Sequence, residues 1–441
     1  MIGRLNVGGG LSIDGIIEEY VAGGEISAGG FVKFVNELEE IPGNGVEAGA
    51  DIQLYSFIRT MNIDISAIAL SDDKVFIAYS DSENNTYGLY GIVCTINDNS
   101  ITKGTSTKLN TAANGNKISA VALSENKVVI FSHQGNGNYL WGTICTISGM
   151  TITVEKATQL STESAGTNIT AVVLSETKVV IITKKLNGIV CTISGTTISK
   201  GTDNELGTEF SAGSITKLSD TKIVIIGYGD YGYGLYGVAC TINGTKITAG
   251  TTIQLDSQGG PGNVVALSDT KVFIAYRHTN NKYYLYAMVC TISGTSITKK
   301  INTQLSTEEY SGTNLSILAL SSNKVFIVHG YNLDNNFLYG LVCTITDTAI
   351  ITGIDTQLTI KIQSAGMVSA VLLSNTNAFV AYKTDSKSDN YLHGVLCSFG
   401  TMMLKAKALQ ASTDEIGGIA KTSVTSGQPV QVVVPSIKEE N

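Results

Sequence analysis

The chain has 441 residues, including 47 Gly and only 4 Pro, and charged residues make up 15% of it. Thr, Ser, Ile and Val are abundant, which is typical of β proteins. Most of the net charge of −8 comes from residues 1–54, which hold nine acidic and two basic residues, so the remainder is nearly neutral. This nearly neutral repeat region offers little basic surface for phosphate backbones, and we expect no nucleic-acid partner. It has no apolar run of membrane-spanning length and no signal segment at its start, so we also expect no membrane partner.

Residues 1–47 form the first segment, in which glycine clusters separate short apolar runs. This pattern predicts short β-strands joined by glycine turns. The segment is too small to bury a core by itself, so we expect it to pack with another part of the chain.

Residues 48–54, A-G-A-D-I-Q-L, form a predicted strand that has a close copy further along the chain. Residues 249–255 read A-G-T-T-I-Q-L and end one of the repeats that follow. The match predicts that 48–54 is a donated outer strand that completes the last repeat. Residues 402–409 could occupy the same place, but they match less closely.

The long central region is a repeat, because one phrase of the type G-I-V-C-T-I returns about every fifty residues. Its seven cysteines are Cys94, Cys145, Cys191, Cys240, Cys290, Cys343 and Cys397. A period of this length is typical of propellers and repeat arrays. Equivalent positions in separate repeats make poor disulfide partners, so we expect free, buried thiols and a reducing compartment.

Each repeat has four predicted strands, as residues 65–109 illustrate. Apolar runs at 65–70, 75–79 and 87–96 are followed by a more polar run at 101–109, with turn residues between them. The first turn has the pattern Leu-Ser-x-x-Lys in most repeats. Seven units of this kind predict a seven-bladed β-propeller closed by residues 48–54. A solenoid is the alternative, but it would need distinct capping repeats.

Strand direction alternates in such a blade, so the tight first and third turns share one rim. The second connections are longer, vary in length, and lie on the opposite rim together with the connections between blades. They are rich in Tyr, Asn and Gly, and long loops on a rigid scaffold often bind ligands. Aromatic faces and amides suit carbohydrate, although turns need Asn and Gly in any case. The candidate ligand-binding residues are Tyr87, Asn138, Tyr139, Trp141, Tyr231, Tyr233, Asn281, Tyr283, Asn336, Phe337, Asn390 and Tyr391.

Metal and catalytic sites are not expected. The four histidines fall in four different repeats, and neither a C-x-x-C pair nor an EF-hand loop is present. A glycosidase needs two carboxylates in one pocket, and the repeated S-x-D-x-G-x-T-W box of sialidases is missing. The predicted inner strands carry small or hydroxylic residues instead: Ser66, Ala67, Ser119, Ala120, Thr170, Ala171, Ser369 and Ala370. We therefore expect no cofactor, no metal and no enzymatic activity.

Residues 398–441 again hold short apolar runs with glycine turns, so they are the expected partner of residues 1–47. Together the two ends could form one small β-barrel-like module, with the propeller of residues 48–397 inserted into it. The fold class is then all-β: a seven-bladed β-propeller inserted into a module made from both termini.

The two ends carry a resemblance to a known family. The phrases A-G-G-x-I-S-A-G-x-F-V-x-F-V-N at 22–36 and G-I-A-K-T-S-x-T-x-G-Q-x-V-x-V-x-V-P at 418–435 are its motifs. Paired, they resemble a module of phage and prophage structural proteins from Gram-positive hosts, similar to small barrels of tail-fibre and capsid-decoration proteins. The resemblance covers under a quarter of the chain.

The resemblance implies a non-enzymatic virion protein, made in the host cytoplasm and present in several copies in the particle. Its terminal module would bind other virion proteins, and the propeller loops would bind a host-surface glycan or another virion protein. We expect a place in the tail or baseplate. The alternatives are a capsid decoration or head-fibre protein and, from another class, a carbohydrate-active enzyme.

Overall fold

The computed structural model describes part of the backbone and fewer of the side chains. The backbone is described at 2–7, 11–22, 31–40, 45–56, 64–83, 86–97, 100–110, 117–134, 139–164, 168–183, 186–207, 209–229, 234–279, 283–306, 310–331, 337–359, 367–384, 391–399, 402–408, 418–420 and 429–435. Side chains are described within 45–399 of these ranges, except at 50, 82, 83, 86, 87, 163, 212, 310–314 and 331.

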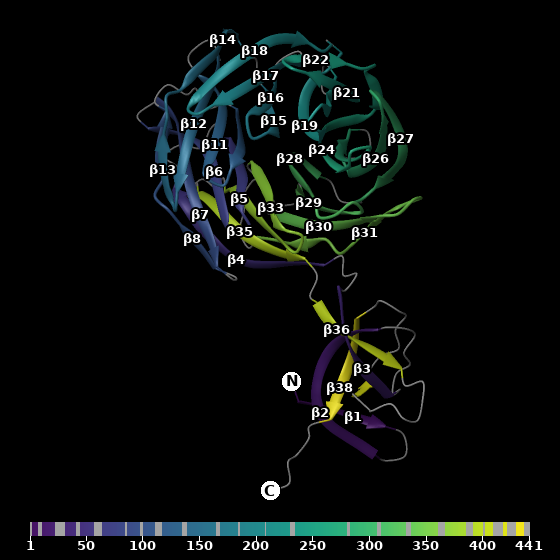
Figure 1. The fold of residues 1–441 in the computed structure, drawn as a ribbon. Coiled ribbons are helices and arrows are strands. Elements are labelled where there is room, and N and C mark those ends of the chain that lie inside the picture. Colours follow the sequence, from purple (N-terminus) through teal and green to yellow (C-terminus); the bar gives the residue numbers. More distant parts are fainter. Residues whose placement is uncertain are drawn as a thin grey trace. The chain divides into compact units, whose positions relative to one another are not determined.

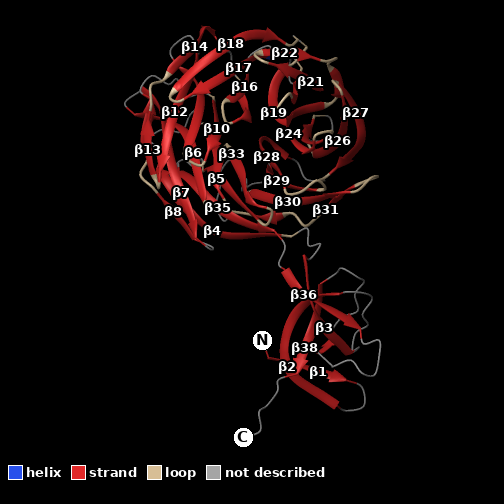
Figure 2. Cartoon of the chain, viewed as in Figure 1, coloured by secondary structure: helices blue, strands red, loops and turns tan. Residues whose placement is uncertain are grey.

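Every secondary-structure element in these ranges is a β-strand (Figure 2). Within the same ranges, no helix is long and apolar enough to cross a membrane. The all-β prediction is confirmed. Two compact units divide the chain: unit 1 contains residues 1–45 and 399–441, and unit 2 contains residues 46–398.

Unit 2 consists of seven antiparallel sheets arranged in a ring (Figure 1), which we number as blades 1 to 7 in chain order. The first strands are β5 (Ile65–Ser71), β10 (Ile118–Ser124), β15 (Thr170–Ser175), β19 (Ser211–Ser219), β24 (Gly259–Ser268), β28 (Tyr310–Ala319) and β33 (Val368–Ser374). Each first strand contacts the first strands of both neighbouring blades, and β33 contacts β5, so the ring is closed. The predicted seven-bladed β-propeller is confirmed.

The remaining strands of each blade follow outward from the axis. The second strands are β6 (Lys74–Glu83), β11 (Lys127–Gln134), β16 (Lys178–Thr183), β20 (Lys222–Tyr228), β25 (Lys271–His278), β29 (Lys324–Tyr331) and β34 (Asn377–Lys383). The third strands are β7 (Thr86–Asn97), β12 (Tyr139–Ser148), β17 (Asn187–Ser194), β21 (Leu235–Asn243), β26 (Leu285–Ser293), β30 (Leu338–Ile345) and β35 (Tyr391–Phe399).

The outer strands are more polar, and four blades have theirs in two pieces. They are β8 (Ser100–Lys103) with β9 (Thr107–Asn110), β13 (Thr151–Val154) with β14 (Thr158–Ser164), β18 (Thr197–Glu205), β22 (Lys246–Ala249) with β23 (Ile253–Asp256), β27 (Ser296–Gln304), β31 (Ile350–Thr352) with β32 (Thr356–Gln357), and β4 (Val46–Ser56).

The core lies in the junctions between blades. In blade 1, Val75 and Ile77 pack against blade 7, whereas Phe76 and Ala78 pack against blade 2. Both faces of a second strand are therefore covered, which explains its continuous apolar sequence. The seven cysteines are free and buried in the same layers, as predicted.

Strand β4 occupies the outer position of blade 7, beside β35. Its last residues are bound in the same way as those of an internal outer strand. The Nζ atom of Lys103 in blade 1 lies 3.1 Å from the carbonyl oxygen of Leu54, and Lys299 makes the same 3.1 Å bond to Leu255 in blade 4. A strand from before blade 1 thus completes the sheet that ends the ring.

Unit 1 combines strands from both ends of the chain. Its strands are β1 (Ile2–Val7), β2 (Leu11–Ala22), β3 (Phe31–Glu40), β36 (Met402–Ala408), β37 (Gly418–Ala420) and β38 (Pro429–Pro435). Strand β2 pairs with β1, β36 and β38; β3 pairs with β36 and β37; and β37 pairs with β38. The sheet therefore closes on itself: β2 pairs with β36, β36 with β3, β3 with β37, β37 with β38, and β38 with β2.

Candidate functional site

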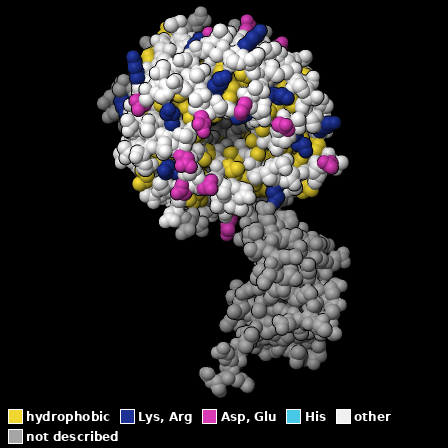
Figure 3. Space-filling model, viewed as in Figure 1, with side chains coloured by type: hydrophobic (Ala, Val, Ile, Leu, Met, Phe, Trp, Pro, Cys, Tyr) yellow, Lys and Arg dark blue, Asp and Glu magenta, His cyan; other side chains and the backbone are white. Residues whose placement is uncertain are grey.

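Two kinds of connection lie at opposite rims of the propeller. The first-to-second and third-to-outer turns are tight, as between Ser148 and Thr151, and form what we call the tight-turn rim. The ends of the second strands and the beginnings of the third strands, such as Gln134 and Tyr139, form the loop rim. One face of the disc is drawn in Figure 3, where basic and acidic side chains are interspersed around a central hollow bordered by apolar ones.

Near the loop rim, aromatic side chains replace aliphatic ones in several blade junctions. Tyr79 and Tyr90 are directly opposite in their sheet, with ring centroids 5.8 Å apart. Tyr276 and Tyr286 lie 6.0 Å apart in blade 5, and equivalent pairs are His329 with Tyr339 and Tyr382 with His393. These aromatic positions therefore belong largely to the packing beneath the rim.

The polar atoms of these buried rings are bound by outer-strand side chains. The Tyr276 hydroxyl donates to Asp256 at 2.7 Å, and Nε2 of His329 lies 3.1 Å from Asp355. Tyr382 donates to Asp51 of the closing strand. Burial raises the pKa of the hydroxyls of Tyr276 and Tyr382, and the adjacent carboxylates raise it further, so both hydroxyls stay protonated.

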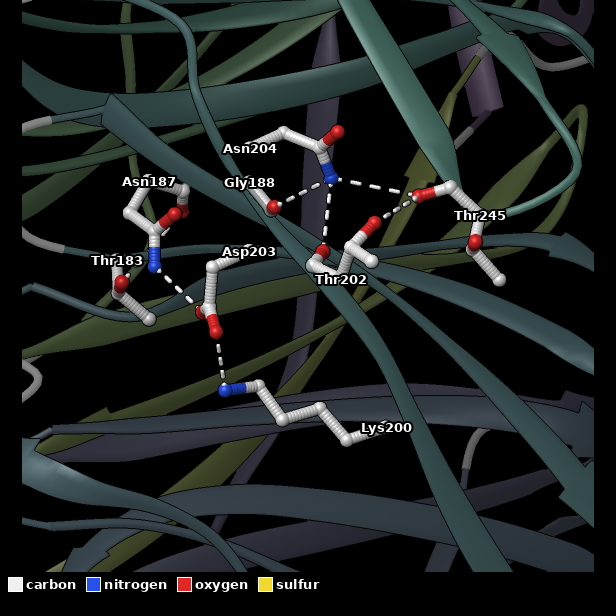
Figure 4. Close-up of polar contacts among 8 residues, drawn as sticks. All are labelled: Thr183, Asn187, Gly188, Lys200, Thr202, Asp203, Asn204 and Thr245. Atoms are coloured by element: carbon white, nitrogen blue, oxygen red, sulfur yellow. Dashed lines mark hydrogen bonds and ion pairs between the residues drawn. The ribbon is translucent and has the colours of Figure 1, made fainter.

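Blade 3 has a short second connection and a polar network where blades 1, 5, 6 and 7 have aromatic pairs (Figure 4). Asn187 donates to Asp203 at 2.9 Å, and Nζ of Lys200 lies 2.6 Å from the same carboxylate. Burial alone would raise the pKa of Asp203, but the hydrogen bonds from Lys200 and Asn187 and the charge of Lys200 lower it overall. Asn204 donates to the carbonyl oxygens of Gly188, Thr202 and Thr245, which ties blade 3 to blade 4.

The channel wall is built from hydroxyl groups that accept backbone hydrogen bonds. The N–H of Ala120 donates to Ser66 at 2.9 Å, and the N–H of Ala171 donates to Ser119 at 3.0 Å. The junctions of blades 4 with 5, 6 with 7 and 7 with 1 repeat this bond. The predicted hydroxylic inner residues thus join neighbouring blades.

One acidic residue extends this ladder toward the loop rim. Asp64 is 7% exposed and accepts a hydrogen bond from the N–H of Ile118 at 2.7 Å. Burial raises the pKa of its carboxyl group, against the opposing effect of Lys117 and two backbone N–H groups. Because this carboxylate is bound to a neighbouring backbone, it serves as a blade-to-blade contact.

The histidines near the rim differ in their surroundings. His133 is 1% exposed, and its Nε2 atom has no hydrogen-bond partner among the described residues. Burial, and then the charge of Lys117, lower the pKa of its imidazole to about 4, which keeps it neutral at pH 7. Among the described side chains, no group of three or more His, Cys, Asp or Glu residues is placed to hold a metal ion.

The structure describes the side chains of five of the twelve predicted ligand-binding residues. Outside the described residues lie Asn138, Tyr231, Tyr233, Asn281, Asn336 and Asn390, and Tyr87 is described only in its backbone. Trp141 is half-buried opposite Ser132 of the second strand. Tyr139, Phe337 and Tyr391 are half-buried at the beginnings of third strands, on blades 2, 6 and 7. Tyr283 in blade 5 is 43% exposed.

Tyr283 lies against an arginine that the sequence had not singled out. The Cζ atom of Arg277, at the end of β25, lies 4.8 Å from the centroid of the Tyr283 ring. Tyr283 has a φ angle of 61°, in the left-handed region that is unusual for a bulky residue. A usable sequence signal existed, because Arg277 is one of only three arginines in the chain.

Comparison with known proteins shows what this fold resembles. No family model and no curated protein sequence matches the chain. Among solved structures, the WD40 domain of Toxoplasma gondii coronin is similar with a TM-score of 0.54 and 8% identity, covering 86% of this chain and 91% of that one. A protein of unknown function from Dyadobacter fermentans has a TM-score of 0.50 and 11% identity, covering 81% and 100% of the two chains.

A candidate 6-phosphogluconolactonase from Bacteroides uniformis is similar as well, with a TM-score of 0.50 and 7% identity over 82% of this chain and 100% of that one. Identities this low support a shared fold only. What this chain shares with these three structures is the architecture of a β-propeller.

Proposed function

We propose that this protein is a non-enzymatic structural protein of a phage-type virion, and that the loop rim of its propeller binds a host-surface glycan. The observation that carries the binding role is the exposed aromatic ring of Tyr283 on that rim, held by Arg277. Sugars present C–H faces that pack on aromatic rings, while their hydroxyls bind amides and charged groups. Another virion protein is the second possible ligand of the same rim.

The virion role is supported by how the two ends of the chain pair. In the sheet of unit 1, β36 from the C-terminal segment lies between β2 and β3 of the N-terminal segment, and β3 also pairs with β37. The same two segments carry the motifs that resemble phage tail-fibre and capsid-decoration modules. We assign the protein to the tail or baseplate, where a glycan-binding rim would serve attachment. A capsid decoration protein is the alternative within the same class.

The absence of enzymatic activity is supported by the chemistry of the described residues. Hydroxyl groups of the channel wall are bound to backbone N–H groups, and Asp64 is bound in the same manner. The buried tyrosine hydroxyls and cysteine thiols have pKa values raised by burial, which suits packing better than nucleophilic or acid–base chemistry.

Co-sedimentation of the purified full chain with host cell walls tests the binding role. We expect the wild type to sediment with the walls and Tyr283→Ala to lose most of this binding. Met150→Ala is the matched control, because Met150 is 37% exposed and lies on the tight-turn rim. Release of soluble sugar would favour the carbohydrate-active enzyme instead. Immunogold labelling of particles distinguishes tail from capsid.

A further inference from the structure

We propose that Arg277 and Tyr283 on blade 5 form a subsite for an anionic group, a carboxylate or a phosphate, carried by a saccharide. This inference rests on the proposed glycan-binding function and adds the chemical class of the ligand.

Arg277 carries a charge that no described acidic residue neutralises. Two lysines of the propeller do have a carboxylate partner: Nζ of Lys200 contacts Asp203, and Nζ of Lys217 lies 2.7 Å from Asp220. Within the part of the chain that the structure describes, no carboxylate lies within 4 Å of the Arg277 guanidinium. A half-buried cation without a counter-ion attracts an anion from solution.

The surroundings of Arg277 hold its guanidinium and leave hydrogen-bond donors unused. The ring of Tyr283 lies over the guanidinium group, a contact that uses its π face and leaves its N–H groups in the plane. Its Nε atom is buried and has no hydrogen-bond partner among the described residues, so the terminal N–H groups are the donors proposed to face the ligand. Planar donors of this kind match the two oxygens of a carboxylate or phosphate.

A glycine permits the approach of Arg277 to the first strand of its own blade. A Cβ atom at Gly260 would lie 3.6 Å from Nε of Arg277 and 3.2 Å from its carbonyl oxygen. The tight contact of a side chain there would be with the backbone oxygen, whereas 3.6 Å from Nε is ordinary van der Waals contact. Blade 5 begins with Gly259, Gly260 and Gly262 around Pro261, so no bulky side chain of this segment lies beside Arg277.

Asp256, at the junction of blades 4 and 5, does not compete for the subsite. Asp256 accepts hydrogen bonds from the Tyr276 hydroxyl at 2.7 Å and from the N–H of Gln258 at 2.8 Å. Tyr276 packs toward blade 4, whereas Ala275 packs toward blade 6. Arg277 lies two residues beyond Ala275 in the same strand, so it is on the blade 6 side, away from Asp256.

The backbone of Tyr283 also points to a ligand role. A φ of 61° strains the backbone of a non-glycine residue, and glycine would relieve that strain. An exposed tyrosine gains little from packing at such a position. Strained backbone that carries an exposed aromatic ring is common where a ligand is held.

Isothermal titration of the full chain with three saccharides tests the proposal: trigalacturonic acid for carboxylate, glucose 1-phosphate for phosphate and galactotriose as the neutral probe. We expect an anionic probe to bind at least tenfold more tightly than galactotriose, and added NaCl to weaken that binding. Which anionic probe binds identifies the group. Arg277→Gln should remove the preference, and Arg277→Lys should retain only part of it because lysine lacks the planar fork.

Lys127→Gln is the control, since it removes the same charge at the tight-turn rim, and thermal unfolding checks that each variant is folded. Equal binding of charged and neutral probes, or an Arg277→Gln variant that keeps the preference, would overturn the subsite while leaving glycan binding intact. Binding of an anionic probe without any binding to host cell walls would instead count against the proposed function alone. Binding of no probe by the wild type would refute the subsite.

Discussion

Asp51 and His393 are 342 residues apart in sequence, yet Nδ1 of His393 lies 2.9 Å from Oδ1 of Asp51. Asp51 is in the closing strand β4, and its other oxygen accepts a hydrogen bond from the Tyr382 hydroxyl. One side chain thus connects the strand that precedes blade 1 to two strands of blade 7. The equivalent positions Asp203 and Asp355 bind their own blades in the same way.

Replacing Asp51 should therefore weaken closure of the ring. Asp51→Ala leaves the buried Tyr382 hydroxyl without this acceptor, and we expect the free energy of unfolding to fall by about 2–3 kcal/mol. Urea denaturation measures the effect. Asp347→Ala, at an exposed turn of blade 6, should change stability by less than about 0.5 kcal/mol. Equal stability of the two variants would show that the contact contributes nothing to closure.

The hydroxyl ladder around the channel predicts a cost for each missing bond. Ser119→Ala leaves the N–H of Ala171 without its acceptor, and we expect a loss of about 1–2 kcal/mol. Ser293→Ala, at an exposed position on the tight-turn rim, is the control. Denaturation curves of both variants give the comparison, and an unaffected Ser119→Ala protein would mean that water or another group satisfies that N–H.

His133 should make the protein less stable in mild acid. Its pKa in the folded state is about 4, below the 6.5 of the unfolded chain, so the unfolded state binds more protons between these values. Stability from this residue is present above pH 6.5 and is lost as the pH falls toward 4. From pH 7 to pH 5 the loss should be about 2 kcal/mol. Between pH 7 and pH 5, the free energy of unfolding of His133→Gln should therefore fall by about 2 kcal/mol less than that of the wild type. Parallel profiles of unfolding free energy against pH would contradict the lowered pKa of His133.

The cysteines should not react in the native protein. Burial raises the pKa of all seven thiols to about 12, and none is accessible in the junctions between blades. A colorimetric thiol reagent should label none of them at pH 8 and all seven in denaturant. Rapid labelling of the native protein would indicate local opening of a junction.

The strained backbone at residue 283 should make glycine more stabilising there than alanine. At a φ of 61°, Tyr283→Gly should be more stable than Tyr283→Ala by about 1 kcal/mol, because glycine adopts this conformation without strain. Both variants should lose the aromatic contact with Arg277. Thermal unfolding ranks the two proteins, and the opposite ranking would show that the left-handed backbone is not kept in solution.

Much of the architecture follows from short-range patterns. The repeated cysteine phrase predicted seven blades, and the turn pattern predicted the strand limits. Both predictions worked because similar residues pack at equivalent positions in every blade. Cys94 and Cys397 lie in equivalent third strands for this reason. The roles of the aromatic residues could not be predicted so well. Trp141 and Tyr283 were both predicted to bind ligand. Trp141 is half-buried opposite Ser132, whereas Tyr283 is exposed beside Arg277.

The polar partners could not be predicted either, since they depend on contacts between strands that are distant in sequence. The sequence around Asp51 and Asp256 does not indicate that their carboxylates accept hydrogen bonds from tyrosine hydroxyls. Arg277 stands out as one of only three arginines, but its contact with Tyr283 depends on the fold.

Hydrogen–deuterium exchange of the full chain, with and without soluble host cell-wall glycan, tests most directly whether the loop rim is the ligand surface. We predict that the glycan protects peptides at the loop rim, above all one spanning residues 277–286, and leaves the tight-turn peptide around residues 148–151 unchanged. Protection confined to the tight-turn rim, or no protection at saturating glycan, would contradict the proposed function.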